Sequence, residues 1–141
     1  MDFQNNKEFV KYLYDEYKQD VPLNCICAHY TEDCIWIYGS SIEEENKKKL
    51  PLIGKFKGHE GIIEFLTEKN KLLNVLKWER ISYENISKDE IKVELNCEYE
   101  LISNSKKNLK IKETHIHKVK DFQSSNVSMT FDIKNYETLF Q

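Results

Sequence analysis

The sequence has no long hydrophobic run and no excess of basic residues. No stretch approaches the roughly eighteen consecutive apolar residues of a membrane-spanning helix. The N-terminal residues are polar and acidic, which is not the pattern of a secretory signal. The net charge is −3, with Lys and Glu mixed along the chain, so no basic face is available to neutralise phosphates. We therefore expect a cytoplasmic protein that binds neither a membrane nor nucleic acid.

The sequence also lacks the spacings typical of metal, redox and nucleotide sites. Its four cysteines are Cys25, Cys27, Cys34 and Cys97. The first two are separated by one residue, whereas zinc and redox pairs are separated by two. We interpret all four as small core residues that stay reduced. Gly54 and Gly58 are not followed by the Lys and Ser/Thr of a nucleotide-binding loop, and we expect no cofactor.

The overall composition of the chain is that of one globular domain. The chain has 141 residues, of which 40% are hydrophobic and 32% are charged. A chain of this length buries roughly two thirds of the surface that its unfolded form exposes, which is enough for a core without disulfides. No internal repeat or low-complexity tract divides it. We predict a single domain over residues 1–141.

The N-terminal half of the chain predicts helices around one short strand. Apolar residues spaced by three and four between positions 9 and 17 predict a first amphipathic helix. Asp20 and Pro22 predict the start of a shorter second helix. The β-favouring run Cys34–Tyr38 predicts a strand, and the charged run Glu43–Lys49 predicts a solvated loop. A Gly-rich entry over residues 54–61 leads into a third predicted helix that reaches Leu73.

From residue 74 the hydrophobic period changes to two, which is typical of strands. We predict strands over residues 75–86, 90–102, 109–122 and 126–136, with turns at 87–89, 103–105 and 124–125. Turns this short make neighbouring strands antiparallel. The sequence therefore predicts an α+β fold in which helices come first and a curved antiparallel sheet follows.

This order of elements resembles the nuclear transport factor 2-like superfamily, in its SnoaL-like and ketosteroid isomerase-like branch. Four segments carry the resemblance: residues 30–34, 50–66, 114–121 and 127–132. The resemblance implies a cone-shaped antiparallel sheet, a cystatin-like α+β barrel, wrapped around the N-terminal helices and an apolar cavity. The Asp-Gly-Lys turn usual in the family is replaced by Asp121-Phe122-Gln123. The position of the general-base Asp in the steroid isomerases is occupied by Tyr38, so that reaction has no obvious base here.

The resemblance implies that large apolar side chains form the cavity wall and contact a small hydrophobic molecule. The aromatic and sulfur-containing candidates for substrate binding are Tyr17, Trp36, Phe56, Phe65, Tyr99, Met129 and Phe131. Phe9, Leu13, Tyr38 and Cys97 are further candidates for the wall. The alternative is that each of these residues only fills the core.

The sharpest polar feature is the row Glu113, His115 and His117. Residues two apart in a strand share a face, so a carboxylate and two imidazoles lie side by side. Lysines at the alternating positions indicate that the histidine face points inward, although Ile116 favours the reverse. An imidazole beside a carboxylate can act as a general base or acid near neutral pH. A metal site and a solvated histidine strand without catalysis are the alternatives.

The candidate catalytic residues follow from this row and from the resemblance. We assign them as His115, His117, Asp132 and Tyr38, with Glu113 in the substrate site. Asp132 would support either imidazole, and Tyr38 or Tyr17 would donate a hydrogen bond to a developing oxyanion.

Two functions of different classes are compatible with the sequence. The first is a cofactor-free isomerase, cyclase or hydratase that acts on a small hydrophobic ring compound. The second is a non-catalytic module that binds a small ligand or a protein partner through the same fold. The resemblance also implies a homodimer across the convex sheet face, although the alternating row from Lys92 to Glu100 is highly charged for such an interface.

Overall fold

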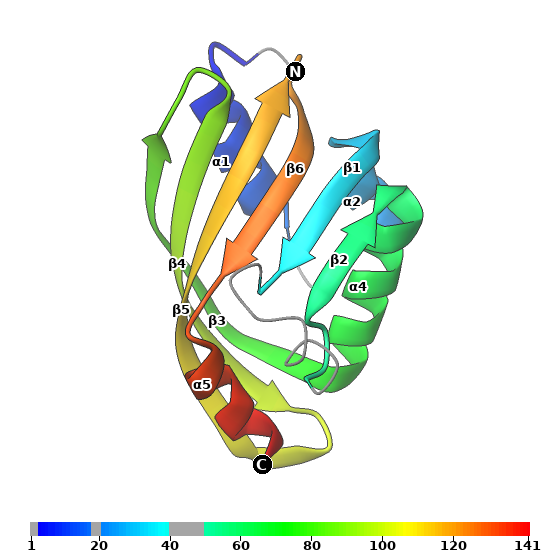
Figure 1. The fold of residues 1–141 in the computed structure, drawn as a ribbon, viewed down its shortest axis with the longest axis vertical. Coiled ribbons are helices and arrows are strands. Elements are labelled where there is room, and N and C mark those ends of the chain that lie inside the picture. Colours follow the sequence, from blue (N-terminus) through cyan, green and yellow to red (C-terminus); the bar gives the residue numbers. More distant parts are fainter. Residues whose placement is uncertain (1–2, 18–20, 40–49) are drawn as a thin grey trace.

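The computed structural model describes residues 3–17, 21–39 and 50–141 and has an α+β fold (Figure 1). The helices are α1 (Asn6–Glu16), α2 (Leu23–Cys27), α4 (Gly58–Leu72), α5 (Ile133–Glu137) and the short 3-10 helix η1 (Thr138–Phe140). The strands are β1 (Tyr30–Tyr38), β2 (Gly54–Lys57), β3 (Leu73–Asn85), β4 (Glu90–Leu101), β5 (Asn104–Lys120) and β6 (Gln123–Thr130). The predicted loop at Glu43–Lys49 and the predicted cap at Asp20 lie outside the described residues.

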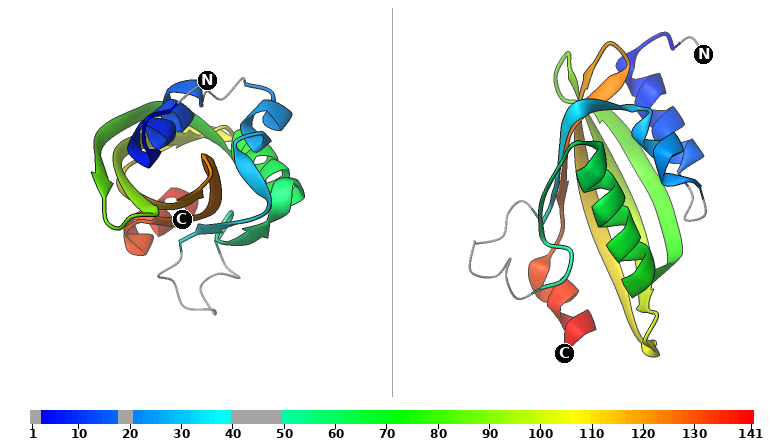
Figure 2. Two further views of the ribbon diagram at one scale, coloured as in Figure 1. Left: turned by 90° about the horizontal axis from the view of Figure 1, so that it is seen from above. Right: turned by 90° about the vertical axis from the view of Figure 1, so that its right-hand side faces the viewer.

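The strands form one strongly curved sheet that does not close into a barrel (Figure 2). Its order is β2-β1-β6-β5-β4-β3, so the long meander from β3 to β6 is antiparallel, as predicted. One pair of strands differs from the predicted antiparallel arrangement, because β1 pairs with β6 in parallel. These two strands are separated along the chain by α4 and four strands, a connection long enough to allow parallel pairing.

The predicted Gly-rich entry to the third helix contains a strand that the sequence pattern does not predict. Residues Gly54–Lys57 form β2, which pairs antiparallel with β1 and so extends the sheet by one strand. The chain then turns directly into α4 at Gly58, whose φ of 68° is in the left-handed region that favours glycine. Gly61 in the first turn of α4 lies against Phe56, where an added Cβ would come within 2.8 Å of the Phe56 carbonyl carbon.

The helices cover the inward face of the sheet with their apolar sides. Helix α1 packs on β3 and β4, and α4 packs on β1 and β2. The predicted stripe of α1 is buried at Phe9, Val10, Leu13 and Tyr14, and the Asn5 side chain caps the helix by accepting from the Glu8 N–H. Within the described residues, no helix is both long enough and apolar enough to cross a membrane.

The C-terminal end differs from the predicted strand over residues 126–136. Strand β6 ends at Thr130, and the exposed Asp132 accepts hydrogen bonds from the Lys134 and Asn135 N–H groups to cap α5. The predicted turn at 124–125 is also wrong, because the hairpin turns at Asp121 and Phe122, which both have positive φ. The cysteine prediction holds for three residues but fails for Cys25, which is exposed.

Candidate functional site

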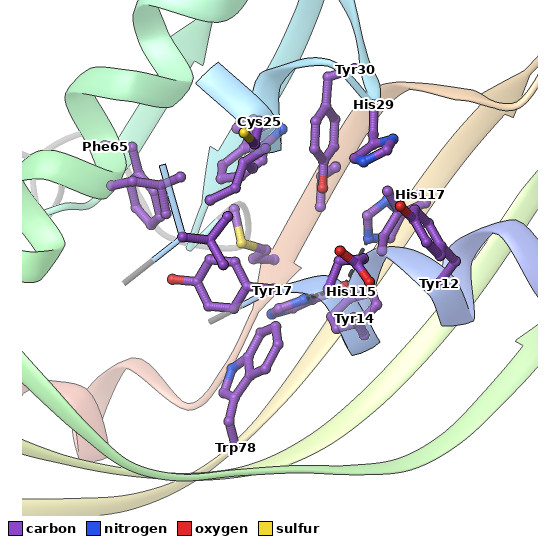
Figure 3. Close-up of a pocket in the computed structure, with 18 of the residues that line it drawn as sticks. Tyr12, Tyr14, Tyr17, Cys25, His29, Tyr30, Phe65, Trp78, His115 and His117 are labelled. Atoms are coloured by element: carbon purple, nitrogen blue, oxygen red, sulfur yellow. Dashed lines mark hydrogen bonds between the residues drawn. The ribbon is translucent and has the colours of Figure 1, made fainter. Parts of the chain in front are cut away.

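A cavity of about 210 Å³ lies between α1, α2, α4 and the inward face of the sheet (Figure 3). Its aromatic wall consists of Tyr12, Tyr14, Tyr17, Tyr30, Trp36, Phe65 and Trp78. Its aliphatic and sulfur-containing lining residues are Leu13, Val21, Cys25, Ile26, Leu66, Val127 and Met129. The polar lining residues are Glu16, His29, Lys69, His115 and His117. An apolar wall with few polar groups is the usual composition of a small-molecule site.

Tyr14 is held in the cavity wall by contacts of its ring and of its backbone with β3. Its ring stacks on that of Trp78, with centroids 5.2 Å apart. The Arg80 guanidinium donates to the Tyr14 carbonyl oxygen at 3.3 Å and to the Asp15 carboxylate at 3.2 Å. Arg80 thereby satisfies a carbonyl near the end of α1 and fixes this end of the helix to β3.

The polar row on β5 faces inward, which confirms the predicted orientation of this strand. Glu113, His115 and His117 are 1%, 4% and 2% exposed, whereas the lysines at positions 112, 118 and 120 are exposed. The strands on both sides present apolar partners, among them Val93 opposite His115 on β4 and Met129 opposite it on β6. The carboxylate and the two imidazoles therefore lie in largely apolar surroundings, where unpaired polar groups are costly.

A continuous chain of hydrogen bonds pairs these groups with one another. The Tyr14 hydroxyl bridges the two imidazoles, at 2.6 Å from His115 Nδ1 and 2.8 Å from His117 Nε2. His115 Nε2 lies 2.8 Å from Glu113 Oε1, and the Tyr99 hydroxyl donates to Glu113 Oε2 at 2.6 Å. His117 Nδ1 lies 3.0 Å from the Ser124 hydroxyl. We call Tyr99, Glu113, His115, Tyr14, His117 and Ser124 the buried relay.

The hydrogen-bond partners determine where the protons of the buried relay lie. An ionised Glu113 can only accept, so in the neutral form of His115 the proton lies on Nε2 and Nδ1 accepts from the Tyr14 hydroxyl. The Tyr14 oxygen then accepts from His117 Nε2–H, and His117 Nδ1 accepts from the Ser124 hydroxyl. All four ring nitrogens are occupied in this arrangement. The Tyr14 oxygen retains one unused lone pair, because a hydroxyl has one donor and two acceptor positions.

Burial and neighbouring charges set the protonation of the buried relay. Burial, followed by the charge of His115, lowers the pKa of His117 to about 3, so His117 is neutral at physiological pH. Burial would raise the pKa of Glu113, but hydrogen bonding to His115, the charges of His115 and Lys69, and the Tyr99 hydrogen bond lower it overall. Burial, with smaller contributions from Tyr30 and Glu113, raises the pKa of Tyr14 well above its ordinary value. Tyr14 is therefore a hydroxyl and not a tyrosinate.

The residues predicted from the sequence divide between the cavity and the packed core. Tyr17, Trp36, Phe65, Met129, His115 and His117 line the cavity, as does Leu13. Phe56, Tyr99, Phe131, Tyr38, Phe9, Cys97 and Glu113 are not among its lining residues.

Two of the predicted catalytic residues, Tyr38 and Asp132, are not among the residues that line the cavity. Tyr38 is 1% exposed and packs against Phe65 and Phe131, and its hydroxyl has no hydrogen-bond partner in the described part of the chain. It is not among the cavity-lining residues, since its ring is enclosed by the rings of Phe65, Phe131 and Tyr136. Asp132 is exposed and caps α5, because the chain turns into a helix where a strand was predicted. The carboxylate that contacts His115 is Glu113.

Several residues of the site were not identified as functional in the sequence. Tyr14 was recognised only as part of the apolar stripe of α1, and Ser124 only as a turn residue. Lys69 occupies a buried position on α4, where periodicity alone would have suggested an apolar side chain. A polar side chain at an apolar position of a helix stripe is the one signal that could have marked Lys69.

In the part of the chain that the structure describes, no group of three or more His, Cys, Asp or Glu side chains is arranged to hold a metal ion. The imidazoles are bonded to protein groups through both ring nitrogens.

Solved structures of other proteins share this arrangement of helices and sheet. An NTF2-like protein from Burkholderia thailandensis has a TM-score of 0.81 at 9% identity, covering 99% of each chain. The chain has the nuclear transport factor 2-like fold. No protein-family model and no curated protein sequence matches it.

Two further structures with this fold have provisional functional names. A Rhodopseudomonas palustris protein, provisionally named an isomerase, has a TM-score of 0.74 at 13% identity, covering 98% of each chain. A Xanthomonas campestris protein, provisionally named a polyketide cyclase, has a TM-score of 0.68 at 12% identity, covering 93% of each chain. At these identities the likeness establishes the fold, and the chemistry has to be argued from the site.

Proposed function

We propose that the protein is a cofactor-free acid–base catalyst of the isomerase or cyclase kind, acting on a small ring compound held in the cavity. The single observation that carries the proposal is the buried relay, which joins a carboxylate, two imidazoles and a tyrosine at the wall of an apolar cavity. A fully buried polar network seldom stabilises a protein more than apolar side chains of the same shape would. Its position against a cavity therefore favours a functional role.

Tyr14 is the group that would exchange a proton with the ligand. Its free lone pair accepts a proton from a ligand atom while its own proton moves to His115 Nδ1, which lies 2.6 Å away. His115 then carries a positive charge, which the Glu113 carboxylate at 2.8 Å compensates. Tyr14 and His115 return a proton to a different ligand atom by the reverse movement. One proton leaves the ligand and one returns, so the net reaction is an isomerisation or a ring closure of the same formula.

The other groups of the buried relay would position Tyr14 and His115. His117 stays neutral because of its burial and donates to the Tyr14 oxygen, which makes it a positioning residue. Tyr99 donates to Glu113 and keeps the carboxylate ionised and oriented toward His115. The names of the Rhodopseudomonas and Xanthomonas proteins support the same class of reaction.

The proposal is tested by the exchange of carbon-bound hydrogen for deuterium in one- and two-ring ketones. 1-Tetralone and 3-cyclohexen-1-one in D₂O serve as probes, with deuterium incorporation and double-bond migration followed by NMR. We expect acceleration by the wild-type protein and a loss of about 100-fold or more in Tyr14→Phe and in His115→Gln.

The matched control is Tyr83→Phe, which removes a tyrosine hydroxyl on β3 outside the cavity lining. This variant should exchange deuterium at the wild-type rate. Circular dichroism establishes that each variant is folded. Equal rates in wild type and Tyr14→Phe on every probe would refute Tyr14 as the proton-transferring group.

A second function, a non-catalytic binding module, is favoured by one specific observation. Every ring nitrogen of His115 and His117 is already bonded within the protein, as it would be in a purely structural network. Native mass spectrometry of the gently purified protein distinguishes the two. A retained small molecule that the wild type releases unchanged and never labels with deuterium would favour the binding module.

A further inference from the structure

A buried lysine lines the cavity beside the buried relay. Lys69 on α4 is 6% exposed, although lysine is almost never fully buried without a partner. Its ammonium lies over the ring of Tyr99 at 5.1 Å and over that of Phe65 at 5.9 Å from the ring centroids. In the described part of the chain it makes no hydrogen bond and no ion pair. The Lys69 ammonium has three donors, and among the described residues it is the buried charged group of the cavity lining with the fewest polar partners.

The Glu113 carboxylate does not serve as a hydrogen-bonded partner for the Lys69 ammonium. The positive charge of Lys69 contributes to lowering the pKa of Glu113, so the two groups interact through space. Both Glu113 oxygens, however, are already bonded to Tyr99 and His115. The Lys69 ammonium lies too far from the carboxylate to form an ion pair with it. Its hydrogen-bonding capacity therefore remains available to a molecule in the cavity.

We propose that the ligand of the cavity is a one- or two-ring compound that carries a carboxylate, and that the Lys69 ammonium binds this carboxylate. An anionic oxygen fills unused N–H donors with charge-assisted bonds, the strongest available in a low-dielectric site. The volume of about 210 Å³ is below the roughly 300–1,000 Å³ of drug-sized ligand sites, which limits the ring system. Aromatic rings in the lining, among them Trp36 on β1 and Trp78 on β3, suit a flat ring.

The position of Lys69 adds a ligand class to the proposed function. The turnover of this ligand rests on that proposed function. Lys69 contacts Tyr99, which bonds Glu113, so the ligand carboxylate lies at the end of the buried relay opposite Ser124. Anchoring one end of the ligand there leaves its ring atoms in the same cavity as Tyr14. The binding of the carboxylate itself requires no catalysis and is tested separately.

The test compares ligands of equal shape and different charge. 2-Naphthoate is compared with 2-naphthamide, and benzoate with benzamide, by isothermal titration calorimetry on the wild-type protein and on Lys69→Met. We expect the wild type to bind the better carboxylate about 10- to 100-fold more tightly than its amide. Lys69→Met should bind the acid and the amide within about threefold of each other, because methionine keeps the apolar stem and removes the charge.

Lys71→Met is the matched control. This residue is two positions along α4, its side chain is 70% exposed, and its ion pair is with the exposed Glu68. The control should keep the full preference for the carboxylate, since the lost charge does not face the cavity. Its loss in Lys71→Met would overturn the assignment to Lys69.

The proposal is overturned if the wild type binds acid and amide equally, if it binds neither carboxylate, or if Lys69→Met keeps the preference. The wild-type comparison decides the question even if Lys69→Met does not fold. Failure of the deuterium-exchange assay with an intact carboxylate preference would refute the proposed function alone. Exchange without any carboxylate preference would refute the role of Lys69 alone.

Discussion

The buried imidazole of His117 makes the stability of the protein sensitive to mild acid. Its pKa is about 3 in the folded protein and about 6.5 in the unfolded chain, so below pH 6.5 the unfolded state binds a proton that the folded state excludes. Stability is therefore complete above about pH 6.5 and falls as the pH decreases toward 3. One pH unit in this window corresponds to about 1.4 kcal/mol. Between about pH 7 and about pH 4.5 the free energy of unfolding should fall by roughly 2.5 kcal/mol from this group.

Urea denaturation at several pH values measures this dependence, with the fluorescence of Trp36 and Trp78 as the signal. The comparison is between wild type and His117→Gln, whose amide can still donate to Tyr14 but does not titrate. The difference in stability between the two proteins should shrink by roughly 2.5 kcal/mol between about pH 7 and about pH 4.5. His29→Gln, at a half-buried histidine of the cavity rim, should retain this His117-dependent loss.

Above about pH 4.5, the pH-dependent change in stability from His117 can be measured apart from that of ionised carboxylates such as Glu113. The pKa of Glu113 is lowered in the folded protein, so its contribution is lost only as the pH falls below the ordinary glutamate range. Parallel stability curves for wild type and His117→Gln between about pH 6.5 and 4.5 would refute the reasoning. Such a result would mean that the folded protein accepts the proton and that the imidazole is not held neutral by burial.

Three further substitutions test the packing around the site. Tyr14→Phe leaves two buried ring nitrogens without their partner, and urea denaturation at neutral pH should show a decrease of about 2–5 kcal/mol in the free energy of unfolding. A decrease below about 1 kcal/mol would argue against the bridging hydroxyl. Gly61→Ala places a methyl group 2.8 Å from the Phe56 backbone, and thermal denaturation should show a cost of about 1–3 kcal/mol, whereas an unchanged melting temperature would contradict this contact. Asp132→Ala removes the cap of α5 and should lower the free energy of unfolding by about 1 kcal/mol. Calorimetry should show an unchanged ligand affinity, and a loss of affinity would place Asp132 in the site.

The inward face of β5 could be predicted because burial leaves a local periodic signal. Lysines at alternating positions mark the face in contact with water, and Glu113, His115 and His117 fall on the other face by elimination. The stripe of α1 was predictable for the same reason. The helix at the end of the chain could not be predicted, because the apolar residues from 127 to 136 fit both a strand period and a helix period. In the structure the Asp132 side chain caps a helix there.

The sequence by itself determined most of the helices and strands and the inward faces of α1 and β5, because these depend on near neighbours. Only the tertiary structure decided which buried polar groups meet. Tyr14 and His115 are 101 residues apart, and their contact depends on the packing of α1 across β5. Lys69 joins the same cavity only because α4 covers the other end of the sheet. Such pairings follow from global packing, which no local pattern of residues records.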